Sequence, residues 1–179
     1  MSLPPIRQRQ PAAGAALAEL CDLARALDPT RPVTYASHET DDPGLGAVDI
    51  LCLNRYPAWY HLPGELELGM AALAADLDAV HAQHPKPIVL TEFGADALPG
   101  AHADPPAMWS EEYQAELVAR VLDIAAERPF VVGAHVWTLA DFATAQADHR
   151  PYATNFKGVF TRDRRPKLAA HALRRRWRA

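Results

Sequence analysis

A short apolar run that ends in a carboxylate constrains the fold of this chain more than any other stretch. Ile88, Val89 and Leu90 follow one another without a polar interruption, a pattern typical of a strand covered on both faces in a parallel sheet. The run ends in residues 91–94, Thr-Glu-Phe-Gly, so Glu92 stands where a buried strand opens into a turn. A carboxylate there is costly to desolvate unless it has a partner or a task. Because ligands bind at the carboxyl ends of parallel strands, we predict that Glu92 is the reacting carboxylate, the alternative being a helix cap or an ion pair.

Composition and charge narrow the class of protein. With 179 residues, 49% of them hydrophobic, the chain is expected to form one globular unit. Its net charge of −4 predicts neither nucleic acid nor a membrane surface as a partner. Cys21 and Cys52 lack metal-type or redox-type spacing, which predicts buried free thiols, a reducing compartment and no metal or cofactor. Without a membrane-length run or a signal peptide, we predict a cytoplasmic location.

Strands and helices alternate along the chain. Residues 1–11 are polar and proline-rich and are expected to be a loose lead-in to a domain over 12–179. The alternation predicts βαβ units, a parallel sheet and the α/β fold class. Helices are expected at 12–27, from 65 to about 84, from 111 onward and at 166–177; strands at 33–36, 48–53, 88–90 and 130–137; and a short extended piece within 155–161.

Apolar residues at helical spacing predict which helix faces are buried. The basic residues of 162–167 and 174–178 are expected to form the solvated face of the last helix. Ser110 is expected to cap the third helix. The predicted buried stripes are Leu17, Leu20, Ala24 and Leu27; Leu66, Met70, Leu73, Leu77 and Val80; and Tyr113, Leu117, Val121 and Ile124.

Polar and aromatic residues follow each predicted strand. Since the carboxyl ends of parallel strands share one edge of a sheet, we expect these residues to form one pocket. A glutamate with polar groups and aromatic walls suits a sugar, whose faces stack on rings. Ordinary core packing is the alternative for each aromatic residue. The segments concerned are 54–56, Glu92, Trp137 and Asp141, and 155–157; the aromatic residues with this alternative are Trp59, Tyr60 and Trp137.

Eight short motifs, in one order along the chain, resemble a known family. They run from about residue 28 to 177 and are similar to the C-terminal part of the catalytic barrel of the β-glucuronidases of glycoside hydrolase family 2. The motifs are Leu53-Asn54-Arg55-Tyr56, Trp59-Tyr60, Thr91-Glu92-Phe93-Gly94-Ala95-Asp96, Met108-Trp109-Ser110-Glu111-Glu112-Tyr113, Val136-Trp137, Ala140-Asp141-Phe142, Asn155-Phe156-Lys157-Gly158 and Phe160-Thr161-Arg162-Asp163.

The resemblance implies a retaining hydrolase of β-glucuronides and a role for several residues. Lysine offers charge-assisted hydrogen bonds to an ionised uronate carboxyl, which fits the implied substrate. Position by position, the family pattern implies that Glu92 is the nucleophile, Tyr56 its hydrogen-bond donor, Asn54 and Tyr60 neighbours of the sugar, Trp137 the aromatic floor, and Asn155 and Lys157 the pair that grips the sugar carboxylate, with Arg150 one residue out of register with a family arginine.

The same resemblance implies an incomplete barrel. The four strands correspond to the fifth to eighth of a (β/α)8 TIM barrel, which needs about 250 residues. Retaining hydrolysis needs a second carboxyl group about 5 Å from the first. In the family it follows an asparagine on the fourth strand, but this chain has no Asn-Glu pair and begins just past that point. We therefore expect the isolated chain to hydrolyse glucuronides poorly, with Asp96 or Asp141 as the surrogate acid if it turns over at all.

An incomplete barrel is also expected to associate. The strands at 33–36 and 130–137 have no neighbour on one side and no lysine or proline to blunt the edge. The inner face, with Val89 and Val132, lacks an opposite wall. We predict self-association or pairing with a missing N-terminal half.

Two other functions compete with a glucuronidase fragment. One is a β-galactosidase-like family 2 fragment acting on a neutral sugar, against which the Asn155-x-Lys157 pair argues. The other is a non-catalytic carbohydrate-binding remnant, for which the missing acid argues.

Overall fold

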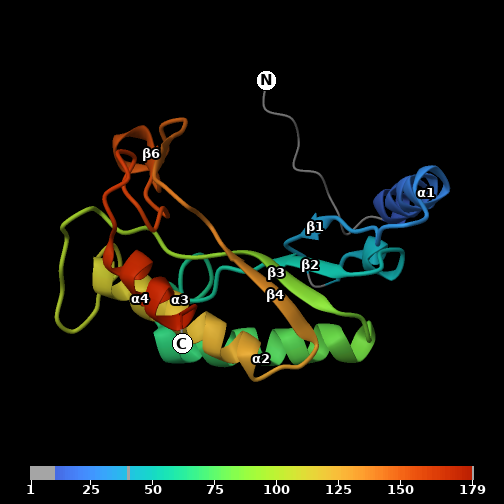
Figure 1. Ribbon diagram of the computed structural model, residues 1–179, viewed down its shortest axis with the longest axis horizontal. Coiled ribbons are helices and arrows are strands. Elements are labelled where there is room, and N and C mark those ends of the chain that lie inside the picture. The colour runs from blue at the N-terminus through green and yellow to red at the C-terminus, as the bar shows by residue number, and fades with distance from the viewer. Residues whose placement is uncertain (1–10, 40, 179) are drawn as a thin grey trace.

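Four parallel strands in chain order form the central sheet of the computed structural model, which describes residues 11–39 and 41–178 (Figure 1). Each neighbouring pair of strands is parallel. This arrangement confirms the predicted α/β class and the parallel sheet. The strands are β1 (Ala36–Ser37), β2 (Leu51–Asn54), β3 (Ile88–Phe93) and β4 (Val131–Val136).

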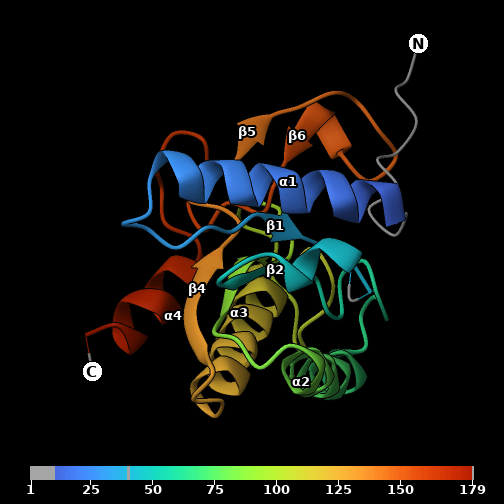
Figure 2. The ribbon, with the colours of Figure 1, turned by 90° about the vertical axis from the view of Figure 1, so that its right-hand side faces the viewer.

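Helices α2 and α3 lie together on one side of the sheet, and α1 lies beyond β1 on the other side (Figures 1 and 2). In chain order α2 follows β2 and α3 follows β3, which is the order of βαβ units. A small antiparallel pair, β5 with β6, stands beyond the end of β4. The helices are α1 (Pro11–Leu27), α2 (Leu66–Gln83), α3 (Glu111–Ala126) and α4 (Leu168–Arg176); the short elements are η1 (Pro43–Gly46), β5 (Phe142–Ala143), η2 (Pro151–Ala153) and β6 (Thr154–Asn155).

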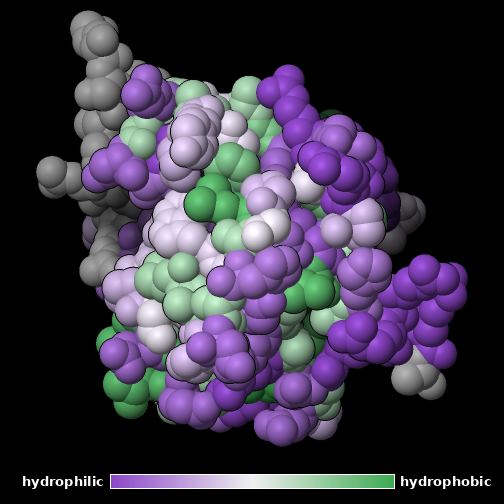
Figure 3. Space-filling view, turned by 90° about the vertical axis from the view of Figure 1, so that its left-hand side faces the viewer, coloured by the Kyte–Doolittle hydropathy of each residue, from purple (hydrophilic) through white to green (hydrophobic). Residues whose placement is uncertain are grey.

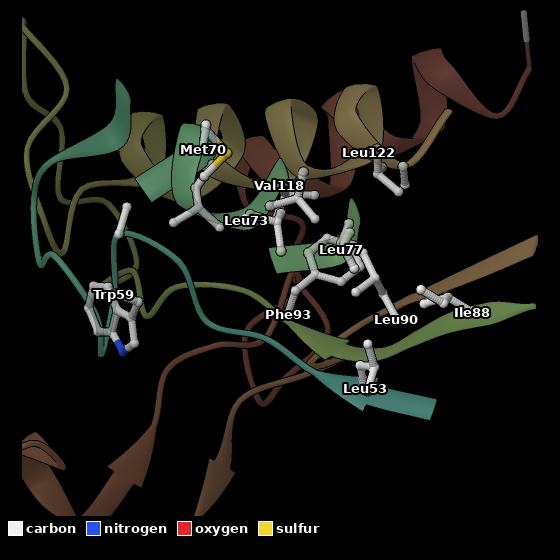
Figure 4. Packing of buried hydrophobic residues seen from close by; sticks show 14 of the residues in the cluster. Leu53, Trp59, Met70, Leu73, Leu77, Ile88, Leu90, Phe93, Val118 and Leu122 are labelled. Atoms are coloured by element: carbon white, nitrogen blue, oxygen red, sulfur yellow. The ribbon is translucent and has the colours of Figure 1, made fainter. Parts of the chain in front are cut away.

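The core lies between the sheet and the pair α2 and α3 (Figure 4). Leu90 and Phe93 of β3 point toward Leu77 of α2 and are fully buried with it. Burying a side chain of this size stabilises the fold by about 1.5–3 kcal/mol relative to leaving it exposed. The stripes predicted for α2 and α3 are confirmed, with Leu66 and Ile124 partly buried at their ends. Ser110 caps α3 as predicted, since its side chain accepts a hydrogen bond from the backbone of Tyr113 at 3.2 Å.

The buried face predicted for α1 is wrong for two of its four residues. Leu20 and Leu27 are 61% and 78% exposed, and the buried residues of this helix are Gly14 and Cys21. The helix packs on the short η1 segment instead of on a wide sheet face. A methyl group on Gly14 would come within 2.9 Å of the Pro43 side chain. This close approach buries a narrow stripe centred on the small residues, leaves Leu17 and Ala24 partly buried, and leaves Leu20 and Leu27 outside it.

Two strand predictions are also corrected. The first strand is Ala36–Ser37 and not 33–36. Val33 instead donates a backbone hydrogen bond to the Asp49 carboxylate, at 2.7 Å, so the chain joins the ladder late. In the predicted extended piece 155–161, only Asn155 belongs to a strand. The thiols of Cys21 and Cys52 are free and buried, as predicted.

β1 and β4 are the two edges of the four-stranded sheet. Val132 on β4 is exposed and Val89 on β3 is partly buried. Figure 3 shows that apolar residues on one face gather in separate patches among hydrophilic residues. Among the described residues, no helix has the length and apolar character needed to cross a membrane. Residues 1–10 of the predicted lead-in lie outside the described residues.

Candidate active site

Glu92 lies at the carboxyl end of β3 with a phenol bonded to its carboxylate. The Tyr56 hydroxyl, two residues beyond β2, donates a hydrogen bond of 2.7 Å to Glu92 Oε2. Burial, and then the hydrogen bond to Glu92, raise the pKa of Tyr56 above its ordinary value. The phenol therefore stays protonated and remains a donor. Within the described residues Glu92 Oε1 carries no recorded hydrogen bond, so one carboxylate oxygen is held and the other is available.

Lys157 is the buried cation of the site. Its side chain is 1% exposed and its ammonium pairs with the fully buried carboxylate of Asp96. The ammonium also donates to the Tyr60 hydroxyl at 3.1 Å. It lies 4.8 Å from the ring centre of Trp59 and 4.7 Å from that of Tyr60, within the range of cation–π attraction. A buried cation is tolerable here because it has a counter-ion, a hydroxyl acceptor and aromatic faces.

Two other predicted residues meet the same cluster. The Asn155 side chain is buried and accepts a hydrogen bond from the Lys157 backbone at 3.0 Å, which shapes the turn that presents the lysine. Arg150 donates to the Tyr60 hydroxyl at 3.0 Å, and its guanidinium lies 3.6 Å from the Asp96 carboxylate. The structure thus brings Tyr60, Arg150, Asn155 and Lys157 together.

Trp137 and Asn54 lie beside the same end of β3. The Trp137 backbone donates to the Phe93 carbonyl at 2.8 Å. Gly94, the residue after Phe93, has φ +153°. A methyl group on Gly94 would come within 2.5 Å of the Trp137 carbonyl oxygen, so only glycine fits at this position. Asn54 pairs in register with Glu92 and accepts a hydrogen bond from the Thr91 hydroxyl at 2.7 Å. Their predicted contacts with a sugar stay predictions.

A second buried lysine–aspartate pair lies behind the first. Lys167 is 0% exposed, and its ammonium donates to Asp141 and to the carbonyl oxygens of Ala97 and Phe156, at 2.8, 2.8 and 2.9 Å. Burial lowers the pKa of Lys167 and raises the pKa of Asp141. The prediction of a solvated basic face is therefore wrong for Lys167. Both residues predicted above as surrogate acids therefore have a buried lysine as partner: Asp141 pairs with Lys167, and Asp96 pairs with Lys157.

The segment 155–158 is held from several sides. The Phe156 backbone donates to Asp96 Oδ1 at 2.8 Å, and Gln114 of α3 donates to the Gly158 carbonyl at 3.2 Å. A methyl group on Gly158 would lie 2.1 Å from the backbone nitrogen of Asp141, so the two backbones touch. These contacts fix the lysine-bearing turn against the segments that follow β3 and β4.

Sequence reasoning missed two members of the cluster. The sequence suggests Asp96 only as a surrogate acid, but the structure makes it the counter-ion of Lys157. It suggests core packing for Trp59, whose ring also lies beside the Lys157 ammonium. The sequence does contain an indication of Asp96. A buried lysine needs a carboxylate as counter-ion, so a buried ligand-binding Lys157 predicts an aspartate or glutamate beside it. Asp96 belongs to the same motif as Glu92 and is the residue that supplies it.

The described residues contain no group of three or more side chains suited to holding a metal ion.

A cavity of about 200 Å³ beside Tyr56 is lined by Arg55, His61 and Asp76 among others. The chemistry available is a carboxylate with one oxygen bonded to a protonated phenol, beside a buried ammonium and a guanidinium that suit an anionic group.

The comparisons with known proteins agree on one family. Residues 8–179 match the model of the glycosyl hydrolases family 2, TIM barrel domain. The chain is 47% identical over 161 residues to a β-glucuronidase from Paenibacillus borealis, covering 89% of this chain and 27% of that protein. It is 44% identical over 158 residues to the human β-glucuronidase, covering 86% of this chain and 24% of that protein.

Solved structures give the same result. The β-D-glucuronidase of Dictyoglomus thermophilum superposes with a TM-score of 0.92 at 41% identity, over 96% of this chain and 30% of that one. A Bifidobacterium dentium β-glucuronidase complexed with coumarin-3-O-glucuronide superposes with a TM-score of 0.88 at 41% identity, over 93% of this chain and 27% of that one. The chain thus spans about a quarter of the length of the curated relatives it matches. It belongs to the TIM-barrel domain family of glycosyl hydrolases family 2.

Proposed function

We propose that the chain is the C-terminal half of a (β/α)8 barrel that takes part in the retaining hydrolysis of β-glucuronides. The observation that carries the proposal is the pairing of Glu92 with Tyr56 beside the buried cation Lys157. The four parallel strands in chain order fit the fifth to eighth strands of such a barrel. The similarity to β-glucuronidases supports the choice of sugar.

Glu92 acts as the nucleophile in this proposal. Its free Oε1 attacks the anomeric carbon, the bond from that carbon to the aglycone oxygen breaks, and the electron pair leaves with the aglycone. Tyr56 stays bonded to Oε2, where its protonated phenol orients the carboxylate. Water then attacks the anomeric carbon and the bond from that carbon to Glu92 breaks, which restores the carboxylate; the proton that the water loses neutralises the released aglycone anion.

The sugar carboxylate binds at the cationic cluster. Lys157 and Arg150 supply positive charge, and Asn155 shapes the turn that carries Lys157. Charge-assisted hydrogen bonds to an ionised uronate distinguish it from a neutral sugar. Trp137 forms the aromatic floor.

The general acid is the part that this chain is proposed to lack. Departure of a poor leaving group needs a proton, and the family pattern supplies it from a Glu that follows an Asn, a pair absent from this sequence. Loss of a general acid costs about 10²- to 10⁴-fold in rate. Turnover of ordinary glucuronides by this chain alone is therefore weak or nil.

A substrate that needs no acid tests the nucleophile directly. We expect 2,4-dinitrophenyl β-glucuronide, whose phenolate leaves unprotonated, to transfer one glucuronyl group to Glu92, detected by mass spectrometry of the intact chain and its peptides. The Glu92→Gln variant forms no adduct. The matched glucoside reacts more slowly, because it offers no carboxylate to Lys157. An adduct on another residue, or equal labelling of Glu92→Gln, contradicts the assignment; sugar binding without any adduct favours a carbohydrate-binding remnant.

We also propose that the chain associates, either with itself or with the missing half of a barrel. β4 is a sheet edge, and an apolar groove lined by Val136, Leu139, Phe160, Leu173 and Trp177 runs beside it. Unpaired edges and apolar grooves favour association. Light scattering during size exclusion measures the mass, and a monodisperse 19.6 kDa monomer with a sharp thermal transition contradicts the proposal.

A further inference from the structure

Asp96 is a fully buried carboxylate to which the proposed chemistry assigns no step. It follows the Glu92 strand and has no exposed surface. Its Oδ2 pairs with the Lys157 ammonium and lies 3.6 Å from the Arg150 guanidinium, while its Oδ1 accepts the Phe156 backbone N–H at 2.8 Å. One carboxylate thus contacts both cations of the cluster and the turn that bears one of them.

The charges of the cluster do not cancel. Lys157 and Arg150 carry two positive charges, and Asp96 carries one negative charge. The remainder is a single positive charge, which one ligand carboxylate neutralises. Without Asp96, two cations would stand together with Lys157 almost fully buried, at a cost in desolvation and repulsion.

The donors of Lys157 are also only partly used. An ammonium has three N–H donors. In the described structure two of them serve Asp96 and Tyr60, so the third has no recorded protein acceptor. Tyr60, the hydroxyl acceptor of the cluster, is 46% exposed, so the cluster adjoins the surface at this residue. Asp96 thereby fixes the direction of the remaining donor.

We infer that Asp96 is the positioning residue that makes the site select a carboxylate-bearing sugar. It acts through Lys157, by pairing with the ammonium and fixing its direction, and touches no substrate itself. This inference rests on the proposed function for the identity of the ligand, but the arrangement of Asp96 and Lys157 is tested without any ligand.

Trace acetylation of lysines in the full-length chain, read by mass spectrometry, is that test. Losing one charge-assisted hydrogen bond is expected to raise the acetylation rate of Lys157 about tenfold in Asp96→Asn. Lys167, which is equally buried but pairs with Asp141 and feels Asp96 only as a weaker, more distant charge, serves as the internal control, and its rate is expected to change much less. Asp141→Asn gives the reverse pattern, with Lys167 faster and Lys157 unchanged.

Adduct formation then tests the specificity. With the dinitrophenyl donors, Asp96→Asn is expected to slow adduct formation from the glucuronide about tenfold more than from the glucoside. The Glu92 adduct in the unsubstituted chain decides the proposed function, and the acetylation pattern decides the positioning role, so the two fail separately. Should Asp96→Asn not fold, NMR of the unsubstituted chain measures the coupling across the hydrogen bond from Lys157 ¹⁵Nζ to Asp96 ¹³Cγ.

Three results overturn the inference. One is a Lys157 acetylation rate that is unchanged in Asp96→Asn. Another is an equal rise for both lysines, which marks general loosening. The third is a Lys157 ammonium visible by NMR without coupling to Asp96.

Discussion

The two buried lysine–aspartate pairs are alike in composition but differ in what their cations have left to offer. The Lys167 ammonium donates three hydrogen bonds, one to Asp141 and two to carbonyl oxygens. The Lys157 ammonium donates two, to Asp96 and Tyr60, and lies close to the rings of Trp59 and Tyr60. A cation whose donors are all satisfied by protein serves the scaffold. One that keeps a donor beside an exposed tyrosine is equipped to bind an anion.

The strongest test of this difference is to remove each cation. Lys167→Met is expected to lower the free energy of unfolding by about 3–5 kcal/mol, because Asp141 then remains buried without its cation. Lys157→Met is expected to cost less, since Arg150 stays near Asp96. Urea denaturation measures both, and equal losses would break the distinction. The double variant Lys167→Met/Asp141→Leu should recover part of the loss, which ties the effect to the unpaired carboxylate.

Binding preference provides the complementary test. Lys157→Met is expected to reduce the rate of adduct formation with the dinitrophenyl glucuronide about 10- to 100-fold, the value of a charge-assisted hydrogen bond. The glucoside rate should hold or rise, because a neutral sugar has no carboxylate to pair with the lost ammonium. If both donors slow down equally, Lys157 is structural too, and the glucuronide assignment falls with it.

A smaller effect is expected from pH. Burial raises the pKa of Asp141, so the folded chain keeps that proton to higher pH than the unfolded chain does. Its contribution to stability is thus present at low pH and lost as pH rises through the folded pKa. The difference in unfolding free energy between the unsubstituted chain and Asp141→Asn should therefore be larger at pH 4 than at pH 7. A difference that shrinks on acidification would show that the pairing with Lys167, and not burial, dominates.

The sequence predicts the sheet and its covering helices because their signals are local and periodic. The run at Ile88 and the stripe through Met70, Leu73 and Leu77 record burial directly in the order of residues. The prediction fails for α1, where small residues meet η1 and leave Leu20 exposed. Close approach at a glycine depends on a partner about 30 residues away, and helical periodicity carries no information about it.

The residues of the candidate site follow strand ends, so their gathering at one edge was predictable. Glu92 and Tyr56 are joined as the family pattern implied, whereas their roles in a reaction stay predictions. The partners of the lysines were not predictable from local pattern. Asp96 and Lys157 are 61 residues apart, and Lys167 sits in a basic run that reads as solvated surface. The fold, and not spacing along the sequence, decides which carboxylate pairs with each lysine.

The contact at Gly158 has a thermodynamic consequence for ligand binding. Because the backbone there touches that of Asp141, the turn that carries Lys157 is already ordered before any ligand arrives. When a ligand binds at such a turn, little of the interaction free energy is lost to ordering the protein backbone. Calorimetry of an anionic sugar should therefore show a small loss of conformational entropy, and replacing Gly158 with alanine should increase that loss by pushing the two backbones apart.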